Sequence, residues 1–225
     1  MILRVLQRVW ALQAADEVVV ATDSAEILAI VGAAGGTAVM TSTRHPSGTD
    51  RIAEVARRSE FRGYDAVVNV QGDEPFVSAA AVKGAIEQVT QRGLMLGTAA
   101  VQAKADVLAS SDVVKVVTDD DGRAMYFSRA PIPYLRDEAD VAERDARVLH
   151  HVGVYAYTPE SLERWITLPP HPLERIERLE QLRPLAAGMR MGVAIIPGPL
   201  RPGIDTEADL ERANREWQTS TVMDD

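Results

Sequence analysis

The sequence predicts an α/β fold in which a mixed, mostly parallel sheet is flanked by helices in a doubly wound, Rossmann-like arrangement. One observation is the alternation of apolar strand-like segments with helix-like segments over the first part of the chain. Another is a change of rhythm over about residues 112–158, where strands follow one another through hairpins and longer loops. This second region predicts an antiparallel excursion from the parallel core.

The amino-terminal part predicts right-handed βαβ units. Ile2, Leu6, Val9 and Trp10 form an apolar stripe at helical spacing. Strands and helices then alternate, with turn or capping residues between them. Strands are expected over residues 17–23, 37–41, 66–70 and 94–101, and helices over 25–34, 49–59 and 78–91.

The carboxy-terminal part begins with the antiparallel region and then returns to the α/β pattern. The run Asp-Asp-Asp-Gly at 119–122 predicts a hairpin turn. Strands are expected over residues 113–118, 123–128, 148–157 and 191–196, and helices over 173–187 and 207–217. No linker is long enough to separate domains, so residues 1–225 are expected to form one domain.

Composition and charge exclude several classes of function. The 225 residues are 46% hydrophobic and 25% charged, as in soluble globular proteins, and no apolar run approaches a membrane span of roughly 18 residues. A net charge of −9 argues against general nucleic-acid binding, which needs a basic surface. The absence of cysteine excludes disulfides and thiol catalysis and fits a cytoplasmic location.

The segment VNVQGDEPF at 68–76 carries the strongest functional signal. An apolar strand runs directly into Gln71, Gly72 and Asp73, and Pro75 ends it abruptly. Acids at the carboxyl end of a parallel strand lie where open α/β sheets bind ligands. Taken alone, the segment also fits a strand that ends in an ordinary acidic turn.

A second acid that could accompany Asp73 follows the last predicted strand. Asp205 lies in GIDTEADL, where Asp205 or Thr206 could also cap the helix that follows. Mg²⁺ usually takes one or two carboxylates together with water and substrate oxygens. Asp73 and Asp205 are therefore the candidate ligands of a magnesium ion that would neutralise phosphate charge.

The segment RHPSGTDR at 44–51 connects a strand to a helix. No standard phosphate loop of the form GxxxxGK[ST] or GxGxxG follows a strand. In this segment Ser47 or Thr49 could cap the helix, and the exposed backbone near its start could bind a base edge or an anion. His45 and Arg51 flank the same turn and favour the second reading.

Further polar residues occur in FSRAPIPY (127–134), HHVGVYAY (150–157) and PLERIERLEQLR (172–183). Arg129 precedes a proline-stiffened loop, which suits a fixed cation. The charged residues of the third segment also fit a solvated helix face, and His151 fits an ordinary strand histidine.

In this order, SGTDR, VNVQGDEP, FSRAPIPY, HVGVYAY, PLERIERLEQLR and GIDTEADLER resemble the 3-deoxy-manno-octulosonate cytidylyltransferases, or CMP-Kdo synthetases, from about Met1 to Arg212. The resemblance implies an α/β nucleotidyltransferase fold and a homodimer built largely by the antiparallel region. It also implies a role in lipopolysaccharide biosynthesis, with the reaction of CTP and Kdo to CMP-Kdo and diphosphate.

The resemblance also assigns roles to residues. Asp73 and Asp205 would hold Mg²⁺, and Arg129 would act with them at the catalytic centre. The cytosine site would contain His45, Ser47 and Gly48. The sugar pocket would contain Arg51, Gln71, Arg129, His151, Tyr155, Glu180 and Gln181.

The resemblance has one departure. Members of the family begin with a strand and a basic loop that wraps the triphosphate, whereas this sequence begins at the helix that follows them. We expect the chain as written to bind CTP weakly and to turn over poorly. The alternatives are a cytidylyltransferase for 8-amino-Kdo or sialic acid, or a truncated, inactive remnant that binds sugar or dimerises.

Overall fold

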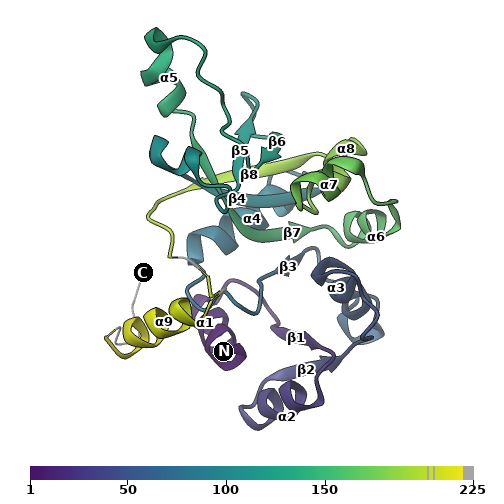
Figure 1. Cartoon of the computed structure of the whole chain (residues 1–225). Coiled ribbons are helices and arrows are strands. Elements are labelled where there is room, and N and C mark those ends of the chain that lie inside the picture. The colour runs from purple at the N-terminus through teal and green to yellow at the C-terminus, as the bar shows by residue number, and fades with distance from the viewer. Residues whose placement is uncertain (202, 205, 220–225) are drawn as a thin grey trace.

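The computed structural model describes residues 1–201, 203, 204 and 206–219, and its strands form two sheets (Figure 1). β1 and β2 pair in parallel. The larger sheet has the order β6-β5-β7-β4-β8, and β3 also pairs with β7. The strands are β1 (Val19–Thr22), β2 (Thr37–Met40), β3 (Val67–Asn69), β4 (Leu96–Gln102), β5 (Lys115–Thr118), β6 (Ala124–Ser128), β7 (Leu149–Tyr157) and β8 (Met191–Ile196).

Helices connect and cover these strands. They are α1 (Ile2–Leu12), α2 (Ala25–Ala33), α3 (Gly48–Ala56), α4 (Ala79–Thr90), α5 (Val141–Asp145), α6 (Pro159–Thr167), α7 (Pro172–Glu177), α8 (Leu182–Ala186) and α9 (Glu207–Thr219). Short 3₁₀ segments lie at η1 (Ser59–Phe61), η2 (Ala105–Ala109) and η3 (Glu138–Asp140). Three helices begin with a capping serine, because Ser24, Ser47 and Ser78 each accept a backbone N–H from the first turn. Ser47 was expected as a possible cap.

The α/β fold with a mixed sheet is confirmed, but the sheet is less parallel than expected. Parallel pairing occurs in β1–β2 and β4–β8. β7 pairs antiparallel with β3, β4 and β5, so the antiparallel region enters the middle of the larger sheet. The pairing of the 148–157 segment on both of its edges is a tertiary property that strand periodicity does not specify.

The prediction of one helix over 173–187 is wrong. α7 ends at Glu177 because Arg178 takes the left-handed conformation, with a φ of 55°. α8 then begins at Leu182, and Pro184 lies in its first turn, where a missing N–H costs little. Glu180 and Gln181 therefore lie in a bend. α6, which begins with Pro159 after the cap Thr158, had no counterpart among the expected helices.

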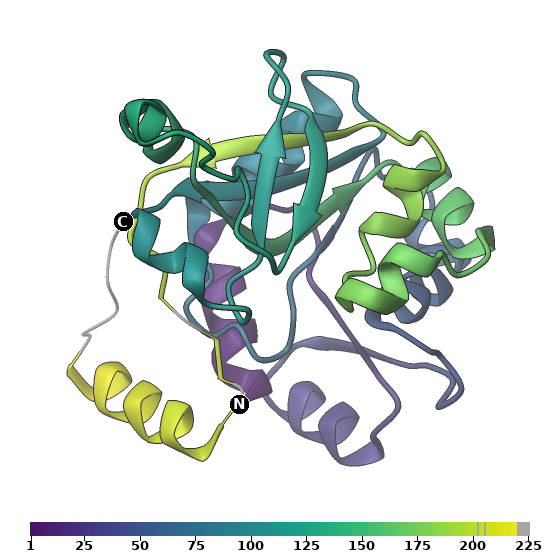
Figure 2. The ribbon, with the colours of Figure 1, turned by 45° about the horizontal axis from the view of Figure 1, so that its top comes forward.

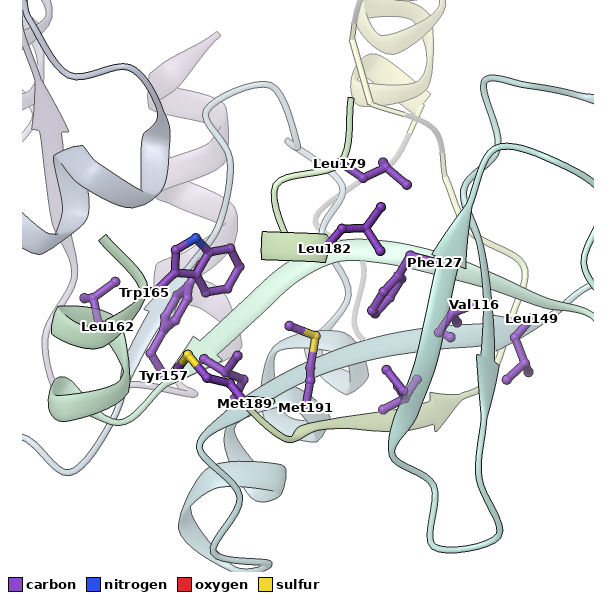
Figure 3. Packing of buried hydrophobic residues seen from close by; sticks show 14 of the residues in the cluster. Val116, Phe127, Leu149, Tyr157, Leu162, Trp165, Leu179, Leu182, Met189 and Met191 are labelled. Atoms are coloured by element: carbon purple, nitrogen blue, oxygen red, sulfur yellow. The ribbon is translucent and has the colours of Figure 1, made fainter. Parts of the chain in front are cut away.

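The larger sheet carries an apolar core on each face. Leu96 and Ala100 of β4 join a cluster around Phe127 and Trp165, shown in Figure 3. Ala99 of the same strand joins a second cluster with α4. Residues 96–101 of β4 are all buried, as expected for a central strand that is covered on both faces. The expectation of a single domain over residues 1–225 stays a prediction.

The last helix returns to the first. The Arg4 guanidinium of α1 lies 4.6 Å from the ring centroid of Trp217 in α9, and the Phe76 ring lies 6.0 Å from the same ring. Figure 2 shows α9 in yellow near the purple α1. This contact brings the carboxy-terminal segment near the loop after β3.

Within the described residues, none of the helices is long and apolar enough to cross a membrane.

Candidate active site

A cavity of about 1110 Å³ lies between the two sheets and reaches the polar ends of several strands. Most of the residues that the sequence singled out line it, although they come from distant parts of the chain. They are Gly48, Arg51, Gln71, Asp73, Arg129, His151, Tyr155, Glu180 and Gln181. His45 and Ser47 are not among its lining residues. The cavity is large enough for a small-molecule substrate.

One part of the cavity is apolar and runs along two strand edges. Residues 18–21 and 66–70 line it consecutively, together with Val5 and Leu6 of α1. Side chains of a strand alternate between its two faces, so a cavity lined by consecutive residues lies against the edge of the strand. This position explains why the strands β1 and β3 are largely half-buried.

The loop after β3 places Asp73 beside the carboxy-terminal segment. Asp73 is half-buried, and its carbonyl accepts the backbone N–H of Ile204 at 3.1 Å. Gly203 packs closely against Glu74, because a Cβ added to Gly203 would lie 2.9 Å from a carboxylate oxygen of Glu74. Asp205 itself lies outside the described residues. Within the part of the chain that is described, no group of three or more His, Asp or Glu side chains could hold a metal ion.

Arg129 is held in the cavity wall by backbone carbonyls. Its Nε donates to the carbonyl of Glu177 and its Nη1 to that of Ser111, both at 2.9 Å. Its own backbone N–H donates to the Glu177 carboxylate at 2.9 Å, and Ser128 Oγ donates to the same carboxylate at 2.6 Å. Among the described residues the guanidinium has no carboxylate within ion-pair distance. A fixed cation of this kind suits an anionic ligand.

His151 is a buried and neutral part of the wall. Its Nε2 lies 2.9 Å from Thr98 Oγ1, and that hydroxyl donates to the carbonyl of Val154 at 2.7 Å. Because a hydroxyl has one hydrogen, Thr98 accepts from His151, which assigns the proton to Nε2. Burial lowers the pKa of His151 to about 3, with a smaller effect from His150. His151 can therefore position a ligand, but it is a poor proton acceptor at neutral pH.

Glu180 and Gln181 occupy the bend between α7 and α8. Thr49 Oγ1 of α3 donates to the Glu180 carboxylate at 3.2 Å, which ties the bend to the start of α3. Burial raises the pKa of Glu180, while hydrogen bonds from Thr49 and Ser47 oppose the shift. Gln181 is buried beside it. Tyr155 packs edge-on against the Trp165 ring, and burial raises the pKa of its phenol.

The remaining candidates have internal partners. Ser47 caps α3 and donates to Asp50 at 2.7 Å, and His45 Nε2 contacts the Glu54 carboxylate. Arg51 lines the cavity, but its guanidinium binds Asp23 at 2.8 Å and Thr41 at 2.6 Å. Arg51 thereby ties the ends of β1 and β2 to α3. The roles of these residues in ligand binding stay predictions.

The structure adds residues to the site that the sequence did not single out. Arg178 and Asp112 line the cavity, and Thr49 holds Glu180. Arg178 stands in a left-handed position that glycine usually takes, so no local signal marked the bend. Thr49 was expected only as a possible cap. Its contact joins segments that are far apart in sequence, and only the tertiary structure brings them together.

The fold and the cavity define the class of this protein as an α/β nucleotidyltransferase. A family model described as cytidylyltransferase matches residues 1–191. The chain is 55% identical over 216 residues to a 3-deoxy-manno-octulosonate cytidylyltransferase of Gemmatimonas aurantiaca, covering 96% of this chain and 83% of that protein. It is 47% identical to the Leptothrix cholodnii protein of the same name, covering 96% and 82%.

A solved structure of CMP:2-keto-3-deoxy-manno-octonic acid synthetase complexed with CTP aligns with a TM-score of 0.88 at 36% identity, covering 97% of this chain and 87% of the other. A 4-diphosphocytidyl-2C-methyl-D-erythritol synthase from Anaerococcus prevotii aligns at 0.60 and 18% identity, covering 96% and 87%, and shows the fold alone. The chain belongs to the 3-deoxy-manno-octulosonate cytidylyltransferase family.

Proposed function

We propose that this protein transfers the cytidylyl group of CTP to 3-deoxy-D-manno-octulosonate (Kdo), giving CMP-Kdo and diphosphate for lipopolysaccharide biosynthesis in the cytoplasm. The observation that carries the proposal is Arg129, a cation fixed in the cavity wall and bonded there only to neutral backbone carbonyls within the described residues. Kdo is a sugar acid, and a guanidinium binds a carboxylate through two parallel hydrogen bonds. The names of the relatives at 55% and 47% identity support the same substrate.

The residues around Arg129 fit the other needs of this reaction. The hydroxyl of Kdo would attack the α-phosphorus of CTP while diphosphate leaves, so catalysis is mostly positioning and charge neutralisation. Gln71, Glu180 and Gln181 offer hydrogen bonds to sugar hydroxyls in the same cavity. Gly48 lies at the start of α3 and has no side chain, so the cytosine ring could approach its backbone closely.

Mg²⁺ is part of the proposal. Asp73 lines the cavity, and the segment before Asp205 is hydrogen-bonded to the Asp73 backbone. Carboxylate oxygens of this kind fit a hard cation that takes its remaining ligands from water and phosphate. When bound, the ion would polarise the phosphoryl group and neutralise its charge.

The test is isothermal titration calorimetry with CTP and with Kdo separately, in the presence of Mg²⁺, followed by an assay of diphosphate release. We expect both ligands to bind and diphosphate to form only when both are present. A protein that binds Kdo but does not bind CTP would instead favour a sugar-binding remnant. Tighter binding of 8-amino-Kdo or sialic acid than of Kdo would contradict the proposed substrate.

We also propose a homodimer that uses the antiparallel region. Met125 of β6 and Tyr134 of the following loop are 62% and 81% exposed, which leaves large apolar side chains of this region open to a partner surface. Sedimentation equilibrium should give a dimer, and Met125→Asp should weaken it. Ile176→Asp, at an exposed position of α7 outside this region, is the matched control. A monomeric wild type would contradict the proposal.

A further inference from the structure

Lys115 is a fully buried lysine whose ammonium is completely hydrogen-bonded. It lies at the start of β5, and its relative exposure is 0%. Its Nζ donates to the carbonyls of Ser110 at 2.8 Å, Val113 at 2.7 Å and Arg129 at 2.6 Å. An ammonium has three donors and no acceptor, so these carbonyls satisfy it. The side chain thereby joins the segment that enters β5 to the residue that follows β6.

The same two segments hold the Arg129 side chain. Lys115 binds carbonyls on both sides of Ser111, and the carbonyl of Ser111 accepts from Arg129 Nη1. Lys115 also binds the carbonyl of Arg129 itself. The Lys115 ammonium therefore holds two things in place. It holds the backbone of Arg129, and it holds the segment whose Ser111 carbonyl accepts from the Arg129 side chain.

A buried ammonium costs more free energy than an apolar side chain in the same place, so packing alone does not account for Lys115. Burial lowers the pKa of Lys115, as does the charge of Arg129, while Glu177 acts in the opposite direction. An apolar side chain of similar length would fill the same space without a buried charge. Lys115 is not among the described residues that line the cavity, so any effect on a ligand passes through other residues.

We propose that Lys115 is a positioning residue that fixes Arg129 in the orientation needed to bind the substrate carboxylate. The inference rests on the proposed function, in which Arg129 binds the carboxylate of Kdo. It goes beyond that function because it assigns part of the sugar affinity to a residue that does not touch the sugar.

A double-mutant cycle tests this role. Calorimetric affinities for Kdo and for CTP would be measured for the wild type, Lys115→Met, Arg129→Ala and the double variant. We expect Lys115→Met to weaken Kdo binding about tenfold, the size of one lost charge-assisted hydrogen bond, with CTP binding unchanged. In the Arg129→Ala background the same change should have no further effect. Additive effects on Kdo binding would overturn the proposal.

Chemical rescue separates positioning from folding. The chain has no cysteine, so a Lys115→Cys variant can be alkylated at one position with 2-bromoethylamine in denaturant and refolded. The product carries an ammonium on a side chain of nearly the original length. Kdo affinity should return to within about twofold of the wild type. A refolded, alkylated protein with the affinity of the unmodified variant would overturn the proposal.

A measurement without ligand distinguishes this inference from the proposed function. Trypsin should cleave the Arg129–Ala130 bond several-fold faster in Lys115→Met, because the carbonyl of Arg129 loses its ammonium donor. Cleavage at Arg62–Gly63, an exposed bond away from Lys115, is the control and should be unchanged. Faster cleavage with no Kdo binding by the wild type would refute the proposed function alone. Equal cleavage rates at Arg129 would overturn the positioning role.

Discussion

The backbone N–H of Ile204 donates to the carbonyl of Asp73 at 3.1 Å. This bond joins the loop after β3 to the segment before α9, although the two are far apart in sequence. It is supported by the contact of Trp217 with Arg4 and Phe76, which holds α9 near the same loop. The position next to Asp205 is therefore fixed beside Asp73, as a shared metal site would need.

Asp73→Asn should abolish the dependence of diphosphate release on Mg²⁺. The amide keeps the shape of the side chain but removes the charge that would hold the cation. A loss of several kcal/mol of charge stabilisation corresponds to a fall in rate of roughly 100-fold or more. Asp106→Asn, at an exposed position in η2, is the control and should keep full activity. An Asp73→Asn protein with unchanged response to Mg²⁺ would contradict the metal assignment.

Arg129→Lys should weaken Kdo binding while CTP binding stays the same. Lysine keeps the charge but cannot form the planar fork, so one of two hydrogen bonds to a carboxylate is lost, a factor of roughly ten. Arg147→Lys, at an exposed ion pair with Glu143, is the matched control. Calorimetry measures both affinities. Equal losses for Kdo and CTP would indicate a general disturbance of the cavity instead.

Glu180→Gln should gain stability relative to the wild type as pH rises. Burial raises the pKa of Glu180 in the folded protein, so the folded state binds more protons than the unfolded state between the ordinary pKa and the raised one. The wild type therefore loses stability as pH rises through this window, and the amide does not. Urea unfolding of both proteins from pH 4 to pH 8 measures the difference. A difference that is constant with pH would contradict the assigned shift.

His151 should make the protein sensitive to mild acid. Its pKa is about 3 in the folded state and near 6.5 when exposed, so the unfolded state binds more protons between these values. This contribution to stability is complete above about pH 6.5 and declines as pH falls toward 3. His151→Gln should show a smaller loss of unfolding free energy between pH 8 and pH 5. An equal loss in both proteins would contradict the prediction.

Gly97→Ala should destabilise the packing of α4 on the larger sheet. A Cβ at Gly97 would lie 2.1 Å from the carbonyl oxygen of Ala85 in α4, and backbone cannot move aside cheaply. Overpacking of this kind costs about 1–3 kcal/mol or more. Gly32→Ala in α2 is the opposite control, because nothing lies within 4 Å and alanine favours the helix by about 0.5–1 kcal/mol. Denaturant unfolding should give changes of opposite sign.

Much of the local structure could be predicted from the sequence, because strand and helix periodicity are local properties. The strands at 37–41 and 191–196 and the helix at 78–91 were placed to within about two residues. The bend at Arg178 was missed, since nothing in its neighbours requires a left-handed residue there. The pairing of β7 with β3, β4 and β5 also lies beyond periodicity, which states that a strand is apolar but not which strands lie beside it.

The sequence by itself determined the family and the set of candidate site residues, because the motifs keep their order and residue types along the chain. The tertiary structure decided how these residues are used. The Arg129 guanidinium is hydrogen-bonded to backbone carbonyls in the cavity wall. The Arg51 guanidinium, in contrast, is bound to Asp23, and the His151 ring is hydrogen-bonded to Thr98. The physical reason is that hydrogen-bond partners and burial, which set charge and orientation, come from segments that meet only in the folded chain.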